Sequence, residues 1–122
     1  MKIGEVAARS GVSIDAIRYY ERRGILKRAA RTASGYRSFE EAVVDRLHLV
    51  RRLQDLGFSL DEVVDALHAH DEGGATCASE RWRLVQVEER IDAKIAQLRQ
   101  TKSAIRRTLA TCDSGHCALS TR

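Results

Sequence analysis

One uninterrupted stretch, residues 78–111, constrains the fold of the whole chain because it contains neither glycine nor proline. Its apolar residues recur three, four or seven positions apart, close to the helical period of roughly 3.6. They are Leu84, Val87, Ile91, Ile95, Leu98, Ile105 and Leu109, with Lys102 in the one gap of the row. This pattern predicts a helix about 50 Å long at ~1.5 Å per residue. Such a helix cannot bury its own apolar stripe, so we expect a homodimer formed through residues 78–111.

One cysteine precedes this stretch and two follow it: Cys77, Cys112 and Cys117. In one chain the helix holds Cys77 and Cys112 apart, whereas an antiparallel pair of helices brings Cys77 of one chain toward Cys112 and Cys117 of the other. Three thiolates suit a soft metal ion. The residues alone leave two alternatives open, namely free reduced thiols or a reactive Cys77 in a redox or electrophile sensor.

The first 25 residues have the pattern of two short helices joined by a tight turn. Apolar residues at helical spacing predict a helix before Gly11 and a second one from Ser13, an N-cap residue, to about residue 23, where Gly24 ends it. Its exposed face carries groups that can contact DNA bases and phosphates: Ser13, Asp15, Arg18, Tyr19 and Arg22. The spacing alone is equally compatible with an ordinary helical hairpin.

A short hairpin is expected next, because Ser34-Gly35 is a turn signal between two extended pieces. Arg31, Tyr36 and Arg37 place two cations and a phenol on this loop, a set suited to phosphate. The alternative is a solvated surface loop.

Two more amphipathic helices follow, over residues 41–56 and 59–70. Six residues are expected on the buried face of the first: Ala42, Val43, Leu47, Val50, Leu53 and Leu56. Gly57 separates the helices, and Ser59 with Glu62 forms a capping box. Three histidines, His48, His68 and His70, are interpreted as surface or packing residues. Residues 71–77 contain two glycines and are predicted to be a linker, whose Thr76 or Cys77 caps the long helix.

Charge and composition narrow the class of protein. The chain has 122 residues, 31% of them charged, and a net charge of +4 that lies mostly in residues 1–60. A basic N-terminal half favours a polyanionic partner. The N-terminus shows no signal peptide and no stretch approaches the ~20 apolar residues of a membrane span, so we expect a cytoplasmic protein with no membrane partner. No catalytic constellation is present, so an enzyme is not expected.

The segment Ile17-Arg18-Tyr19-Tyr20-Glu21, followed by Gly24-Ile25 and by Arg31 with Gly35-Tyr36-Arg37, resembles the MerR family of bacterial transcription regulators. The resemblance implies a mainly α-helical protein with a winged helix-turn-helix head over residues 1–70, a long antiparallel coiled-coil dimerisation helix, and a metal-binding loop over residues 112–122. It implies binding of double-stranded promoter DNA, which is remodelled for RNA polymerase. The DNA-binding set is Ser13, Arg18, Tyr19, Tyr20, Arg22, Arg31, Gly35, Tyr36 and Arg37. Lys27-Arg28 stands where members of the family often carry proline.

The resemblance also bears on the metal. Members that sense divalent soft metals carry a cysteine just before the dimer helix, which implies Cys77, Cys112 and Cys117 as ligands here. Mercury(II) is the first expectation, with cadmium(II), lead(II) and zinc(II) as alternatives, and control of metal-resistance genes as the role. Only four residues separate Cys112 from Cys117, fewer than is usual in the family. Whether His116 also ligates stays open. A metal-buffering protein is the competing class.

Overall fold

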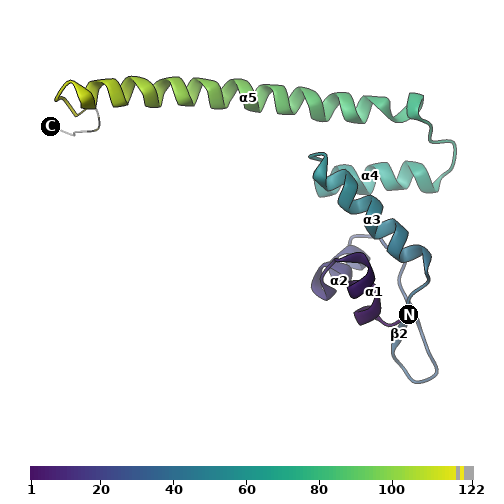
Figure 1. Ribbon diagram of the computed structural model, residues 1–122. Helices are drawn as coiled ribbons and strands as arrows, with labels where there is room; N and C mark the ends of the chain where they lie inside the picture. Colours follow the sequence, from purple (N-terminus) through teal and green to yellow (C-terminus); the bar gives the residue numbers. More distant parts are fainter. Residues whose placement is uncertain (118, 120–122) are drawn as a thin grey trace. The chain divides into compact units, whose positions relative to one another are not determined.

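The computed structural model describes residues 1–117 and 119, and over these residues it is mainly α-helical with one small sheet (Figure 1). The elements follow the order α1 (Ile3–Ser10), α2 (Ile14–Arg22), β1 (Ala30–Arg31), β2 (Arg37–Ser38), α3 (Ala42–Asp55), α4 (Leu60–Asp71) and α5 (Cys77–Asp113). The chain divides into two compact units, Met1–Arg81 and the part from Trp82 onward. We call the first unit the head. No helix among the described residues is long and apolar enough to cross a membrane.

The turns of the helix-turn-helix form as the sequence predicts. Gly11 follows α1 with φ 72° and donates its N–H to the carbonyl of Ala7. Ser13 caps α2, because its side chain accepts a hydrogen bond of 3.1 Å from the N–H of Ala16. Gly24 follows α2 with φ 76°, a conformation that a side chain disfavours. Local signals therefore fix where α2 begins and ends.

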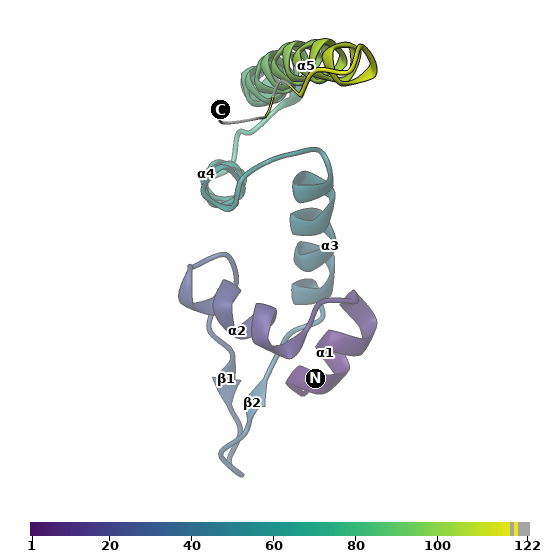
Figure 2. The same cartoon turned by 90° about the vertical axis from the view of Figure 1, so that its left-hand side faces the viewer.

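The hairpin is an antiparallel pair in which Ala30 lies opposite Ser38 and Arg31 lies opposite Arg37. Its turn contains Gly35 at φ 84° and closes with a 2.8 Å bond from the N–H of Thr32 to the carbonyl of Tyr36. Figure 2 shows β1 and β2 extending away from the helices of the head beside α2. We call residues 30–38 the wing.

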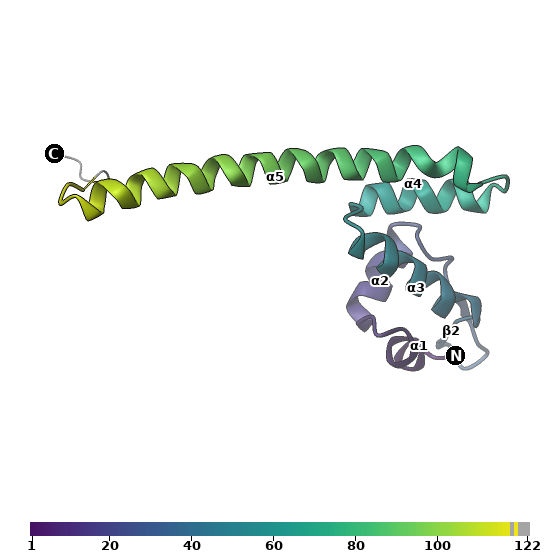
Figure 3. The same cartoon turned by 45° about the horizontal axis from the view of Figure 1, so that its top comes forward.

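The core of the head includes aliphatic side chains from each of the helices α1 to α4. Val6, Ile17, Leu47 and Val63 are fully buried, and α3 packs against α1 and α4 (Figure 3). The capping box at the start of α4 is confirmed, with Ser59 and Glu62 exchanging bonds of 2.8 and 3.2 Å.

The predicted buried face of α3 is wrong in three places. Val44 is buried but was not assigned to that face, whereas Ala42 and Leu56 were assigned to it but are exposed. The buried residues Val44, Leu47 and Val50 follow one another at three-residue steps. Leu56 lies past the last residue of α3 as its C-cap, where the chain turns at Gly57 with φ 98°.

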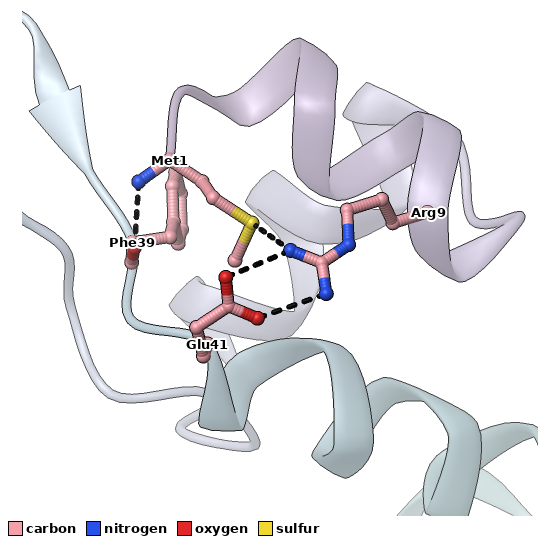
Figure 4. Close-up of polar contacts among 4 residues, drawn as sticks. All are labelled: Met1, Arg9, Phe39 and Glu41. Atoms are coloured by element: carbon pink, nitrogen blue, oxygen red, sulfur yellow. Dashed lines mark hydrogen bonds and ion pairs between the residues drawn. The ribbon is translucent and has the colours of Figure 1, made fainter.

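The start of the chain is tied to the connection between β2 and α3 (Figure 4). The Met1 amine donates to the Phe39 carbonyl at 2.9 Å, and the Phe39 N–H donates to the Met1 carbonyl at 2.7 Å. Beside this pair, Arg9 of α1 forms hydrogen bonds with Glu41 and with the sulfur of Met1, each at 2.9 Å. Arg9 lowers the pKa of the Glu41 carboxyl through this bond. These contacts fix the base of the wing to α1.

Helix α5 is longer than predicted by one residue at its start and two at its end, because it begins at Cys77 and ends at Asp113. Thr76 is its cap: the side chains of Thr76 and Ser79 each accept from the other's N–H, at 3.0 and 2.9 Å. At the other end the N–H of His116 donates to the Thr111 carbonyl, and Gly115 has φ 92°. Cys112 therefore lies inside the helix and not in the loop that follows it.

Most of the predicted apolar stripe of α5 is exposed in a single chain. Val87 is buried, whereas Leu84, Ile91, Ile95, Leu98, Ile105 and Leu109 are between 41% and 56% exposed.

Candidate nucleic-acid interface and metal ligands

The exposed face of α2 carries Arg18, Tyr19 and Arg22, as predicted. Within the described residues, Arg18 makes no hydrogen bond or ion pair. The Tyr19 hydroxyl accepts a 3.1 Å hydrogen bond from Arg23, and the guanidinium of Arg22 lies 5.6 Å from the centre of the Tyr19 ring. Arg23 also pairs with Asp61 of α4, and these hydrogen bonds raise the pKa of the guanidinium. The end of α2 is thus held to α4 while its outer cations face solvent.

Two other predicted residues on α2 have contacts inside the head. The Ser13 oxygen is the acceptor of the helix cap, which leaves its O–H free to donate to a phosphate. Tyr20 is half-buried, and its hydroxyl donates a 3.3 Å hydrogen bond to Gln54 of α3. This contact gives Tyr20 a structural role in joining α2 to α3.

The wing places its predicted residues at the surface. Arg31 donates a 3.0 Å hydrogen bond to the carbonyl of Gly35, so it braces the turn. The Lys2 ammonium lies 4.6 Å from the centre of the exposed Tyr36 ring. Arg37 bonds to Glu21 of α2 at 2.6 Å and keeps 43% of its side chain exposed.

Glu21 is a functional candidate that the sequence analysis left unassigned. Its side chain is 5% exposed and accepts two hydrogen bonds, from Arg37 at 2.6 Å and from the N–H of Ala29 at 3.1 Å. Through this one carboxylate, α2 contacts the residue before β1 and the first residue of β2, and so holds both strands of the wing in place. The available signal was its position, four residues after the buried Ile17 and so on the inward side of α2.

Two adjoining hollows between α2 and the wing share Glu21, Arg28 and Arg37 as lining residues, and have volumes of about 340 and 200 Å³. Ala29 and Arg31 complete the lining of the larger hollow, and Arg18 and Arg22 complete that of the smaller. The surface that joins the helix to the wing is therefore strongly cationic, as an interface for a polyanion requires.

All three cysteines are exposed and free. Cys77 is the first residue of α5 and Cys112 is 35 positions further along the same helix, which separates them by about 52 Å at ~1.5 Å per residue. Cys117 follows the turn at Gly115. Within one chain, residues 1–117 and 119 contain no group of three or more His, Cys, Asp or Glu side chains able to hold a metal ion. The thiols are available to a soft ion, but one chain does not bring Cys77 to Cys112.

The histidines lie outside any such group. His48, His68 and His70 are exposed, and His68 lies 3.2 Å from Glu72. His116 is also exposed, and its N–H is used in the turn that ends α5.

Comparison with known families identifies the combination of a winged helix-turn-helix head and a long helix. Residues 1–70 match the model of the MerR HTH family regulatory protein, and residues 44–108 match the model described as MerR, DNA binding. The chain belongs to the MerR family. The resemblance of the Arg18-Tyr19-Tyr20 helix and the Gly35-Tyr36-Arg37 wing to this family is confirmed.

Individual relatives extend over most of the chain. The mercuric resistance operon regulatory protein of Bacillus cereus is 39% identical over 100 residues, which are 81% of this chain and 75% of that protein. The transcriptional regulator ZntR of Escherichia coli is 30% identical over 120 residues, 97% and 85% of the two chains. These MerR relatives are transcription regulators, which agrees with the prediction of a regulator and not an enzyme.

Solved structures of MerR regulators share the fold. The regulator PbrR691 of Ralstonia metallidurans in complex with lead(II) has a TM-score of 0.85 at 24% identity, covering 100% of this chain and 92% of that one. MerR of Bacillus megaterium in complex with mercury(II) has a TM-score of 0.71 at 30% identity, covering 99% and 90%. The winged head followed by a long helix is therefore the fold of this chain.

Proposed function

We propose that the chain is a homodimeric, metal-responsive regulator of promoter DNA, with mercury(II) as the first-choice effector. The observation that carries this proposal is the placement of Cys77 and Cys112 at opposite ends of one continuous helix. A site that uses both cysteines needs a second chain, and the exposed apolar stripe of α5 gives that chain a surface to pack on. Antiparallel pairing then forms two equivalent sites, each with Cys77 of one chain and Cys112 and Cys117 of the other.

The DNA-binding part of the proposal rests on the head. Arg18 and Arg22 point outward from α2, and Tyr36 is exposed on the wing. In this arrangement α2 enters the major groove and the wing contacts the phosphate backbone. A dimer carries two heads, so it reads a palindromic operator.

The metal part rests on the donor set and on two relatives. Exposed thiolates favour soft ions, and a bound soft divalent ion supplies a cross-link between the two chains. The Bacillus cereus relative is named for mercuric resistance, and the Bacillus megaterium structure holds mercury(II). Mercury(II) is therefore proposed ahead of cadmium(II), lead(II) and zinc(II).

The proposed output is a change in promoter shape that lets RNA polymerase initiate transcription of metal-resistance genes. For this the ion must bind the activating state of the dimer more tightly than the resting state. Bending a site of this kind costs about 1–6 kcal/mol by elastic estimates, which is within the range of a thiolate site's binding energy.

A mixed-dimer experiment tests the shared site. We expect Cys77→Ser and Cys112→Ser each to abolish tight mercury(II) binding as homodimers, measured by titration of the reduced protein. A heterodimer of these two variants keeps one complete site, because the Cys112→Ser chain supplies Cys77 and its partner supplies Cys112 and Cys117. We therefore expect the purified heterodimer to bind half as much mercury(II) as the wild-type dimer, and a randomly exchanged equal mixture to bind about a quarter. No recovery in a verified heterodimer would contradict a site shared between chains.

The competing classes predict other outcomes in the same preparation. A metal buffer would bind mercury(II) but show no preference for operator over unrelated DNA. A thiol redox sensor would respond to an oxidant in the absence of metal, through the same cysteines. Replacing mercury(II) by cadmium(II), lead(II) or zinc(II) in a promoter transcription assay identifies the effector.

A further inference from the structure

The cleft between α2 and the wing contains many more cationic than anionic side chains. We define this cleft by the charged residues that line its two hollows: Glu21 with Arg18, Arg22, Arg28, Arg31 and Arg37. One carboxylate thus faces five guanidinium groups. The balance of charge in the cleft is strongly positive, which favours an anionic ligand.

The single carboxylate is already engaged. Both oxygens of Glu21 accept hydrogen bonds, one from Arg37 and one from the N–H of Ala29. Arg31 donates to the Gly35 carbonyl. Across residues 1–117 and 119, Arg28 makes no hydrogen bond, ion pair or ring contact, and its side chain is exposed. Its donors are therefore free for a ligand.

The backbone at Arg28 is nevertheless held in place. The next residue, Ala29, is half-buried, and its N–H is fixed to the buried Glu21. A proline at position 29 would remove this donor, whereas alanine keeps it. Arg28 lines both hollows, so its free guanidinium is available at the cleft while the neighbouring backbone is held in place.

We propose that Arg28 binds a backbone phosphate of double-stranded DNA in this cleft, with Glu21 as the positioning residue that anchors it. A guanidinium donates two parallel hydrogen bonds to a phosphate, which matches the free group at this position. The cleft lies between the recognition helix and the wing, so the inference rests on the proposed DNA-binding function and adds a contact to it. Arg37 then acts mainly in holding the wing to α2.

The salt dependence of DNA binding tests this contact. Each neutralised phosphate contributes about 0.9 to the slope of log affinity against log salt concentration. Because the proposed dimer carries two heads, we expect Arg28→Ala to lower the slope by about 1.8 per dimer, so that its deficit relative to wild type shrinks about tenfold between roughly 50 and 200 mM salt. The probe is a labelled duplex that the wild-type chain selects from a random pool, followed by fluorescence anisotropy. An unrelated duplex of equal length should show the same loss of slope, because phosphate contacts carry no sequence information.

Two matched variants make the result specific. Arg28→Lys keeps the charge and is expected to retain the wild-type slope. Lys27→Ala removes an equal charge from the neighbouring residue, which lines a different hollow beside Glu40 and Arg46, and is expected to change the slope by less than half as much. Thermal unfolding of all three variants should match wild type, because Arg28 makes no contact in the head.

The outcomes separate the two claims. A wild-type slope in Arg28→Ala, or equal losses in Arg28→Ala and Lys27→Ala, would overturn the phosphate site and leave the regulator proposal standing. A wild-type chain that showed no preference for any duplex in the selection would contradict the regulator proposal itself. If that chain also bound no duplex at all, both would fail.

Discussion

The head and the long helix α5 differ in whether their apolar side chains are buried within one chain. In the head, Val6, Ile17 and Leu47 are fully buried by short helices of the same chain. In α5, Ile95 and Leu98 remain 41% and 56% exposed. A short helix buries its stripe where turns return the chain to it, whereas α5 runs for 37 residues without a turn. The core of the head is therefore complete within one chain, whereas the apolar stripe of α5 is left for the partner chain of the proposed dimer to cover.

This difference separates two kinds of stability. Burying apolar side chains within the head stabilises it at any protein concentration. In the proposed dimer, burial along α5 depends on association, so its contribution should vary with protein concentration. The same division applies to chemistry, because the cationic cleft is complete in one head while the cysteines are divided between the ends of α5. Substitutions in the head should therefore lower its stability at any protein concentration, whereas substitutions in α5 should weaken association.

The largest effect is expected from charges on the stripe of α5. Replacing Ile95 and Leu98 together by aspartate would bury unpaired carboxylates in the proposed interface, each costing several kcal/mol. We expect the dissociation constant of the dimer to rise more than about 1,000-fold, which sedimentation equilibrium measures. Hydrogen exchange in α1–α4 should stay unchanged.

The matched control for this variant places the same two charges on the other side of α5. Ala96→Asp with Gln100→Asp is expected to leave the chain dimeric, because these positions lie roughly 140–180° around the helix from the stripe at about 100° per residue. A dimer that survived the Ile95 and Leu98 substitutions would show that this stripe is not the interface.

A core substitution in the head should produce the opposite phenotype. Leu47 is fully buried, and Leu47→Ala is expected to destabilise the head by about 2–5 kcal/mol through lost burial and a cavity. Hydrogen exchange of the α1–α4 amides measures this loss, which should not vary with protein concentration. Leu56→Ala removes the same atoms from a side chain that is 55% exposed and should change stability by less than about 0.5 kcal/mol. Equal effects of the two variants would contradict the assignment of the core.

What the sequence predicts well is what short-range signals control. The caps at Ser13 and Ser59, the turn at Gly24 and the course of α5 each depend on residues within a few positions, and all were predicted. The end of α5 was placed too early because Thr111-Cys112-Asp113 has no helix breaker, and the turn comes only at Gly115.

The features that escaped prediction join residues far apart in the sequence. Glu21 meets Arg37 and Tyr20 meets Gln54 across 16 and 34 positions, and no periodicity encodes such contacts. The buried face of α3 was misassigned for the same reason, since the position of α1 and α4 decides whether Val44 or Leu56 is covered. The division of the cysteines followed from length alone, but their joint use as metal ligands stays a prediction.

Loss of the Glu21 carboxylate should have the next largest effect. Glu21→Ala leaves the N–H of Ala29 without its acceptor and releases Arg37, which we expect to destabilise the wing by about 1–3 kcal/mol. Faster hydrogen exchange over residues 29–38 would report the loss. Glu40→Ala removes an exposed carboxylate near the same strands and should leave the exchange unaltered. Equal protection of the wing in both variants would contradict the positioning role of Glu21.

Loss of a helix cap should also have different effects in the head and in α5, with smaller changes in stability. Ser59→Ala and Thr76→Ala each remove one cap and are expected to cost about 1 kcal/mol. The Ser59 cap starts a helix whose Val63 and Leu67 lie in the core, so its loss should lower the stability of the whole head. The first turn of α5 is mostly exposed, so loss of the Thr76 cap should only increase local exchange there. Asparagine at either position should restore the wild-type behaviour, and a global effect of Thr76→Ala would contradict this division.

The smallest expected effect is the loss of stability at low pH that comes from the ion pair between Arg46 and Asp71. Arg46 of α3 holds both oxygens of Asp71, at 2.7 and 2.8 Å, and these hydrogen bonds lower the pKa of that carboxyl. Because the folded state then binds the proton less readily than the unfolded chain, the stabilisation is fully present above the ordinary aspartate pKa of about 3.9 and is lost as pH falls through the lower folded value. Asp71 is half exposed, so its contribution should stay below about 1 kcal/mol and shrink with added salt.

We therefore expect Asp71→Asn to be slightly less stable than wild type at pH 7 and to converge with it near pH 3, followed by urea unfolding of the head. Glu41, whose carboxyl pKa Arg9 also lowers, supplies acid sensitivity that persists in both proteins, so only the difference between them isolates Asp71. Convergence of the two stabilities at low pH distinguishes a charge effect from a packing effect, because an asparagine that merely disturbed packing would lower stability equally at both pH values. A constant difference from pH 7 to pH 3 would mean that the Arg46 pair contributes contacts to the head but no charge-dependent stability.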